Sequence, residues 1–182
     1  MELVQPIRDK KKIEEIKSVL KENGSRDLLL FCVGINTGLR VSDLLKLTVA
    51  DVRGKSHVEI KEQKTGKVKR FPLLGNLQSM LEEYCRNKPL NEYLFKSRNG
   101  INKPITRVMA YNIINSACRK CGIQDNIGTH TLRKTFGYHH YQQFKDVAIL
   151  QYILNHSSPS ITLRYIGIAQ DNIEATLQEF EL

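Results

Sequence analysis

The stretch "HVEIKEQKTGKVKRFPL", residues 57–73, decides the fold class because it interrupts a helical pattern that holds on both sides of it. Val58 and Ile60 alternate with polar residues, "KTGK" supplies a turn, and a second short run follows from Val68 to Phe71. We therefore expect an antiparallel β-hairpin here, alone or within a three-stranded sheet. The predicted fold class is α+β, mainly α-helical with this one small β element.

On either side of the hairpin, apolar residues recur at the spacing of amphipathic helices. Helices are predicted over residues 11–22, 26–35, 42–47, 77–87, 107–121, 131–144 and 145–154. No repeat or Pro/Gly/Ser-rich linker divides the 182 residues, a length that suits one ordinary domain. We expect a single domain over 1–182 that begins with a helical lead-in at 1–24.

The closing segment, residues 170–182, is predicted to be a further helix with Ile173, Leu177 and Phe180 on one apolar stripe. Such a stripe needs a partner to cover it. Either the helix folds onto the core of its own chain or it docks on a neighbouring protomer.

The charge balance indicates a polyanionic partner. Lys and Arg number 28 against 19 acidic residues, a formal net charge of +9. This balance points to a polyanionic partner rather than to a neutral metabolite. From charge alone, a nucleic-acid partner and a basic protein that binds nothing charged are equally good explanations. The sequence has no run of the ~20 apolar residues that span a membrane and no secretory signal, so we expect a cytoplasmic protein without a membrane partner.

The cysteines are expected to be buried rather than paired or metal-bound. In a reducing compartment a free cysteine behaves as a small hydrophobic residue. A C-x-x-C motif ends the helix predicted over 107–121, but no second ligand pair accompanies it, so a structural zinc site is disfavoured. The four are Cys32, Cys85, Cys118 and Cys121.

The segment "GTHTLRKTFGYHH", residues 128–140, carries charged groups that core packing does not explain. If Thr129 caps a helix here, then His130, Arg133 and Gly137 lie together on one face near the helix N-terminus. Unpaired backbone amides and a guanidinium favour a phosphate at such a place. The alternative is an ordinary solvated polar face.

Three other residues raise the same question in different settings. Arg40 follows a glycine turn and precedes Ser42, a candidate N-cap, with Asp43 close enough in sequence to orient the arginine. Lys64 lies at the tip of the hairpin, and His156 follows the end of a predicted helix. Each has an ordinary structural explanation when taken alone.

Together, these side chains form the set that phosphoryl transfer requires. Attack on a phosphodiester spreads negative charge over the nonbridging oxygens, where fixed cations stabilise the transition state. A tyrosine nine residues after His156, Tyr165, could act as the nucleophile if a cationic pocket favours its phenolate. The leaving sugar oxygen needs a proton, which a lysine or a histidine can supply.

The motifs that carry these residues resemble those of the tyrosine recombinases, the phage integrase family that includes the Xer recombinases. Four match in family order from about residue 25 to the C-terminus: "NTGLRVSDLLKLTVADV", "KTGKVKRFPL", "HTLRKTF" and "LNHSSPSITLRYIGI". The resemblance implies the catalytic-domain fold of that family. It also implies site-specific recombination of double-stranded DNA by a homo-oligomer, without a metal ion, ATP or another small-molecule cofactor.

The resemblance also implies a role for each residue. Arg40 and Arg133 would hold the scissile phosphate, and His130 would assist as a general base or hydrogen-bond partner. His156 would donate to a phosphate oxygen, and Lys64 would protonate the departing 5′ oxygen. Tyr165 would attack phosphorus to give a 3′-phosphotyrosyl link, and Asp43 would orient Arg40.

The chain departs from the family pattern in two places. Asn155 stands where many members have glycine, a tolerable change because asparagine adopts the left-handed conformation readily. Only about 25 residues precede the first matching helix, so the family's N-terminal core-binding domain is expected to be missing. A module that binds DNA without recombining, or a type IB topoisomerase-like enzyme, is therefore an alternative. We also expect Tyr165 to lie on a mobile segment away from the site in the absence of DNA.

Overall fold

The computed structural model describes residues 4–63, 66–168 and 180. Lys64 and most of the predicted C-terminal helix, with Ile173 and Leu177, lie outside the described residues; Phe180 is described and is exposed. None of the described helices has the length and apolar character that a membrane crossing requires.

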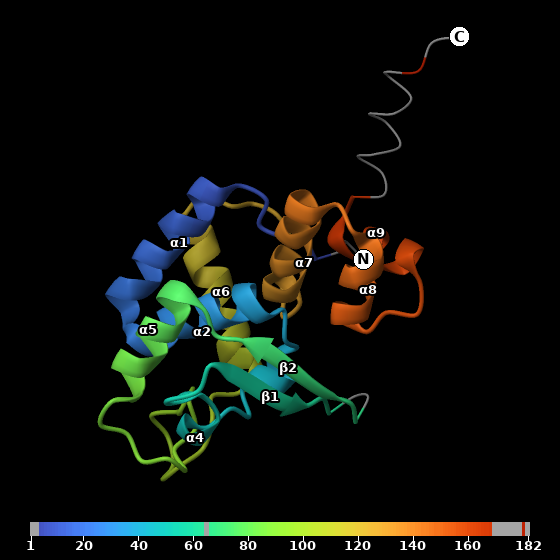
Figure 1. Ribbon diagram of the computed structural model, residues 1–182. Helices are drawn as coiled ribbons and strands as arrows, with labels where there is room; N and C mark the ends of the chain where they lie inside the picture. The colour runs from blue at the N-terminus through green and yellow to red at the C-terminus, as the bar shows by residue number, and fades with distance from the viewer. Residues whose placement is uncertain (1–3, 64–65, 169–179, 181–182) are drawn as a thin grey trace.

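The described residues form helices around one small sheet, in agreement with the predicted class (Figure 1). Every predicted helix before residue 155 is present, although the one predicted over 42–47 is only four residues long. The helices are α1 (Lys10–Asn23), α2 (Ser25–Thr37), α3 (Val41–Leu44), α4 (Val49–Val52), α5 (Gly75–Cys85), α6 (Arg107–Lys120), α7 (Thr131–Phe144), α8 (Val147–Leu154) and α9 (Pro159–Ile166).

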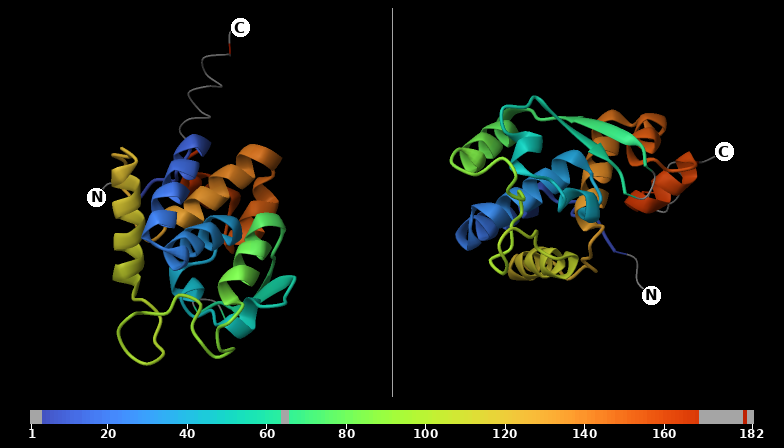
Figure 2. Two further views of the ribbon diagram at one scale, coloured as in Figure 1. Left: turned by 90° about the vertical axis from the view of Figure 1, so that its left-hand side faces the viewer. Right: turned by 90° about the horizontal axis from the view of Figure 1, so that it is seen from below.

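The main core surrounds α2, the helix most completely buried. Its side chains from Leu29 to Val33 are almost inaccessible to solvent, and α1, α5, α6 and α7 all pack against it. Figure 2 shows α2 enclosed by these helices in two further views. Because α2 is apolar on nearly every side, it fixes the position of the Gly38–Arg40 turn that follows it.

The hairpin is two-stranded in the described residues and confirms the alternation in the sequence. β1 (His57–Lys61) pairs antiparallel with β2 (Val68–Pro72), with Val58 opposite Phe71. Those two side chains are buried. The sheet extends from the side of α4 toward α8 (Figures 1 and 2).

A second, smaller core joins α7, α8 and α9. It contains Leu150, Leu154 and Ile166, fully buried, with Tyr165 packed against them. Gly137 makes this packing possible, because a Cβ added there would lie 2.8 Å from Ile166 Cγ2. The space beside Gly137 is therefore occupied by helix α9.

Three local predictions are wrong. The N-cap of α3 is Arg40 rather than Ser42, and the N-cap of α7 is His130 rather than Thr129. The third is the mobile segment predicted around Tyr165, which is instead the helix α9. Ser158 caps this helix with its side chain and Pro159 occupies its first turn, so the polar "SSPS" is a helix start.

The prediction that the four cysteines are buried is confirmed. All four thiols are free and buried. Burial raises the pKa of the Cys118 thiol to about 12, so that thiol is inert at neutral pH.

Candidate active site

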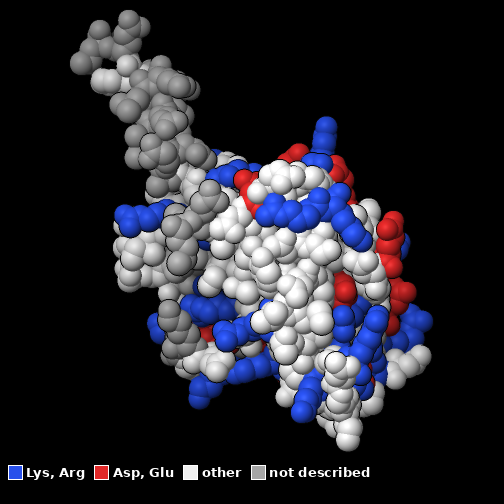
Figure 3. Space-filling view, turned by 180° about the vertical axis from the view of Figure 1, so that it is seen from behind, with Lys and Arg blue, Asp and Glu red and all other residues white. Residues whose placement is uncertain are grey.

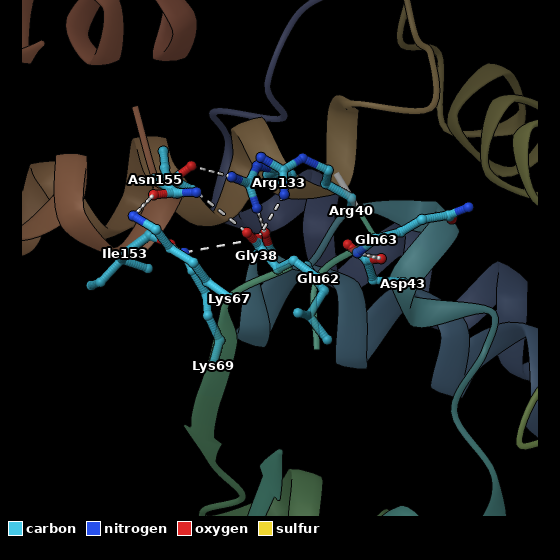
Figure 4. A network of polar contacts seen from close by, with 12 residues as sticks. Gly38, Arg40, Asp43, Glu62, Gln63, Lys67, Lys69, Arg133, Ile153 and Asn155 are labelled. Carbon is cyan, nitrogen blue, oxygen red and sulfur yellow. Dashed lines mark hydrogen bonds and ion pairs between the residues drawn. The ribbon is translucent and has the colours of Figure 1, made fainter. Parts of the chain in front are cut away.

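Five of the six predicted catalytic residues converge where the two cores meet. Arg40 precedes α3, His130 and Arg133 occupy the first turn of α7, His156 follows α8, and Tyr165 lies on α9. The sixth, Lys64, lies outside the described residues. Figure 4 shows part of this cluster, with the two arginines close together above the hairpin.

Arg133 is the most deeply buried member, only 3% exposed. Its Nη1 donates to the Gly38 carbonyl at 2.6 Å, and its Nη2 donates to the Leu154 carbonyl at the end of α8. Burial lowers the pKa of this guanidinium, and the neighbouring Tyr165 opposes that shift. Arg133 thus ties α7 to both flanking turns, and these two hydrogen bonds fix the position of its charge within the site.

The end of α8 supplies two of the site's groups. Asn155 adopts the left-handed conformation at φ 53°, and His156 N donates back to the Gln151 carbonyl, which closes the helix. The expectation that asparagine can replace the family's glycine here is confirmed.

His156 follows directly and is held by Thr162. Its Nδ1 lies 3.1 Å from Thr162 Oγ1. Burial, reinforced by Arg133, Arg40 and Lys69, lowers the pKa of His156 to about 4, so the imidazole is neutral at pH 7. Thr162 Oγ1 donates its own proton to the Ser158 carbonyl at 3.2 Å, so the tautomer of the neutral imidazole decides which ring nitrogen of His156 donates.

Tyr165 lies inside the cluster, so the prediction that it would be away from the site is wrong. Its hydroxyl is 3.2 Å from His130 Nδ1, and its ring packs edge-on against His156 with centroids 4.8 Å apart. Burial raises the pKa of the phenol, while Arg133 and Arg40 oppose the rise. Packing of α9 against Gly137 accounts for this position.

The predicted contact between Asp43 and Arg40 is not what the structure shows. The Asp43 carboxylate is buried, and its Oδ1 accepts from the backbone N–H of Gln63 at 3.0 Å. Asp43 therefore holds the hairpin next to Lys64. Arg40 is paired instead with Glu62, Nη1 to Oε1 at 2.7 Å.

Four residues near the site were not identified from the sequence. Glu62 and Lys69 are buried hairpin groups whose partners are distant in the sequence. Lys134, 7% exposed, places Nζ 5.0 Å from the Tyr165 ring centroid. Arg107 begins α6 and lines the same pocket as Arg40. Only Lys134 had a local signal, because it directly follows Arg133.

A pocket of about 380 Å³ opens beside the cluster. Arg40, Arg107 and His130 line it with the polar side chains of Ser42 and Thr129. Basic and hydroxyl groups at the start of α7 suit an oxyanion, because the helix N-terminus adds its own unpaired amides. The pocket can therefore hold a phosphate next to the phenol.

Comparisons with known proteins agree with this geometry. The model of the phage integrase family matches residues 8–171, and the chain belongs to that family. "Probable integrase/recombinase YoeC" of Bacillus subtilis is 51% identical over 180 residues, which cover 99% of this chain and 98% of YoeC. A "Tyrosine recombinase" of Pseudothermotoga lettingae is 34% identical over 175 residues.

The solved structures that resemble the chain have the same fold. XerA recombinase superposes with a TM-score of 0.77 at 21% identity, covering 98% of this chain and 66% of XerA. XerH recombinase follows with a TM-score of 0.74 at 21% identity, covering 97% of this chain and 53% of XerH. The chain likewise spans 59% of the Pseudothermotoga protein, so it matches one part of these longer relatives.

Proposed function

We propose that this chain is a tyrosine recombinase catalytic domain, extending over 1–182, that cleaves and rejoins a DNA strand through a phosphotyrosyl intermediate. One observation carries the proposal. The Tyr165 hydroxyl lies 3.2 Å from His130 Nδ1, and the buried guanidinium of Arg133 opposes the rise in the pKa of the phenol, beside a basic pocket. A nucleophile, a base and an anion-binding group thus meet at one point.

The phosphate would be bound before it reacts. Arg40 and Arg133 approach from two sides, and a guanidinium can offer two parallel donors to phosphate oxygens. His156, neutral with a pKa of about 4, would supply a third contact, donating to a phosphate oxygen in the tautomer that carries its proton on Nε2. These donors are fixed by their protein partners, so they stabilise the charge that develops in the transition state without reorganising.

The chemical step follows from the contacts of the phenol. Tyr165 Oη forms a bond to phosphorus while His130 takes its proton, and the bond from phosphorus to the 5′ oxygen breaks. Lys64, on the hairpin turn, would give a proton to the departing 5′ oxygen. The 3′-phosphotyrosyl ester conserves the bond energy, so attack by another 5′-hydroxyl reverses the sequence and rejoins a strand.

The expected partner is double-stranded DNA in the cytoplasm, bound by a homo-oligomer. The charge of +9 supports this, and Lys and Arg side chains gather over the lower part of the face in Figure 3. XerH was solved bound to its difH substrate, and a lambda integrase tetramer was solved on a Holliday junction. The segment 170–182 would contact a neighbouring protomer in such an assembly.

Trapping the intermediate tests the proposal. The protein is incubated with nicked duplexes from which the cleaved fragment diffuses away, and covalent adducts are separated under denaturing conditions. Wild type and Tyr152→Phe, an exposed tyrosine on α8, should form the adduct, and Tyr165→Phe should not. Salt-sensitive binding without any adduct would instead identify a DNA-binding module.

A further inference from the structure

Glu62 is a buried carboxylate at the centre of the site, and the phosphoryl-transfer steps above do not use it. It follows the last residue of β1, and its side chain has no exposure to solvent. Its backbone closes the hairpin, because Glu62 N donates to the Lys67 carbonyl at 2.9 Å and Gly66 N donates to the Glu62 carbonyl at 2.8 Å. A buried charge is costly unless its partners compensate for the lost water.

Three elements of the fold supply those partners (Figure 4). Arg40 Nη1 lies 2.7 Å from Glu62 Oε1, and Lys69 Nζ lies 3.8 Å from the same oxygen. Asn155 Nδ2 reaches Oε2 at 3.5 Å from the end of α8. One carboxylate therefore links the turn before α3, strand β2 and the helix end that precedes His156.

Lys69 extends the link in a second direction. Its Nζ donates to the Ile153 carbonyl, one of the carbonyls that the end of α8 leaves without a helical partner. Burial lowers the pKa of Lys69, and Glu62 opposes the shift. Lys69 thus joins strand β2 to the end of α8, and its charge lies beside that of Glu62.

The electrostatics explain why a carboxylate is needed at this position. Arg40 lowers the pKa of Arg133, which means that the two guanidiniums repel each other, and Glu62 acts in the opposite sense. The contact with Glu62 engages one nitrogen of Arg40, and a guanidinium carries five N–H donors. Arg40 can therefore be held by Glu62 and still present donors to a phosphate.

We propose that Glu62 is a positioning residue, which orients Arg40 for the scissile phosphate and couples that arginine to the end of α8. The proposal rests on the strand-cleavage function proposed above. A buried ion pair adds little stability compared with well-packed apolar residues, so its expected contribution is to geometry. Loss of Glu62 should therefore slow cleavage more than it weakens DNA binding.

The test uses Glu62→Gln in the full chain, with Glu59→Gln as the matched control. Glu59 lies on β1, three residues before Glu62, but its ion pair with Arg70, at 3.7 Å, is exposed. Single-turnover cleavage of nicked duplexes, equilibrium binding to uncleaved duplex and thermal unfolding are measured for each protein. A second duplex carries sulfur at the 5′ bridging position, since a thiolate leaves without a proton donor and its cleavage bypasses Lys64.

The expected result is a cleavage rate about 10- to 100-fold lower in Glu62→Gln, the loss expected for a hydrogen bond to a charged group. Binding should change by less than about 3-fold because the pocket stays cationic. The sulfur duplex should leave the defect in place, because Arg40 acts on phosphate oxygens. If Glu62→Gln does not fold, Glu62→Asp, which keeps the charge but shortens the reach, should fold and still lose about 10-fold in rate.

Three results would overturn the proposal. Cleavage by Glu62→Gln equal to that of Glu59→Gln would show that Arg40 needs no such partner. Recovery with the sulfur duplex would show that Glu62 acts through Lys64, and a parallel loss of binding and melting temperature would show a structural role. If wild type and Glu59→Gln form no adduct either, the strand-cleavage function fails and this proposal fails with it.

Discussion

Substitution of Gly137 by alanine should disturb the site without changing any group that reacts. Gly137 lies on α7 where α9 crosses it, and its backbone is ordinary helix, so alanine brings no backbone strain. A Cβ at this position would lie 2.8 Å from Ile166 Cγ2 and 3.3 Å from Leu154 Cδ1. Carbon atoms prefer to be at least about 3.5 Å apart, so α9 must move outward by about 0.7 Å.

Two opposing effects set the stability of this variant. Alanine favours the helix by about 1 kcal/mol over glycine, whereas overpacking a tight core costs about 1–3 kcal/mol. The net loss is therefore about 0–2 kcal/mol, a fall in melting temperature of up to about 6 °C for a chain of this size. Activity should suffer more, because Tyr165 moves with α9 and a displacement near 1 Å costs about 100-fold in rate.

Thermal unfolding and single-turnover cleavage measure the two effects separately. Ile166→Ala serves as the second-site change, since it removes the methyl group that the new Cβ meets. In the double variant the two losses of stability should be less than additive by about 1 kcal/mol, and part of the cleavage rate should return. A Gly137→Ala protein that melts at a higher temperature and cleaves at the wild-type rate would refute the packing argument.

The remaining predictions concern charged groups around Tyr165. His156 has a pKa of about 4, below its ordinary value near 6.5, so its contribution to stability is present above pH 6.5 and is lost as the pH falls through 4. After allowance for partial exposure, wild type should lose about 1–2 kcal/mol more than His156→Gln between pH 7 and pH 4 in denaturant titrations; parallel pH profiles would contradict this. Lys134→Met should slow cleavage about 3- to 30-fold and Lys134→Arg less, with unchanged DNA binding, because a cation over the ring stabilises the phenolate. Lys64→Ala should lose cleavage of ordinary DNA and regain it on the sulfur duplex; equal defects on both would remove Lys64 as the proton donor.

The sequence predicts the helices and the hairpin well, because each carries its own periodicity. Alternation at Val58 and Ile60 identifies the only β element in the described part of the chain. Two helices are exceptions: no helix is predicted over α4, and the serines before Pro159 are interpreted as a mobile segment rather than as the cap and first turn of α9. The serine cap and the proline that begin α9 are local signals, and both can be read from the sequence.

The site residues likewise divide into those that the sequence predicts and those that only the fold reveals. Arg40, Arg133 and Tyr165 could be found because their chemistry is evident from residue type and from family motifs. Glu62 could not, because its role depends on burial and on a contact with Arg40 that lies 22 residues away in the sequence. Asp43 was assigned to Arg40 on nearness in sequence, yet the fold directs it to Gln63.

The position of Tyr165 in the absence of DNA is likewise a tertiary effect. It follows from the space that Gly137 leaves on α7 for Ile166 of α9, two positions 29 residues apart in the printed sequence. No local pattern in the α9 segment indicates that contact. The structure thus places the phenol beside His130 and near Arg133.

The most direct test of the account is to identify the atom that becomes attached to DNA. The adduct trapped on a nicked duplex is digested with protease, and the nucleotide-bearing peptide is sequenced by mass spectrometry. The account predicts a 3′-phosphate esterified to Tyr165, with a free 5′-hydroxyl on the released strand. A nucleotide attached to any other residue, or a 5′-linked adduct, would contradict it.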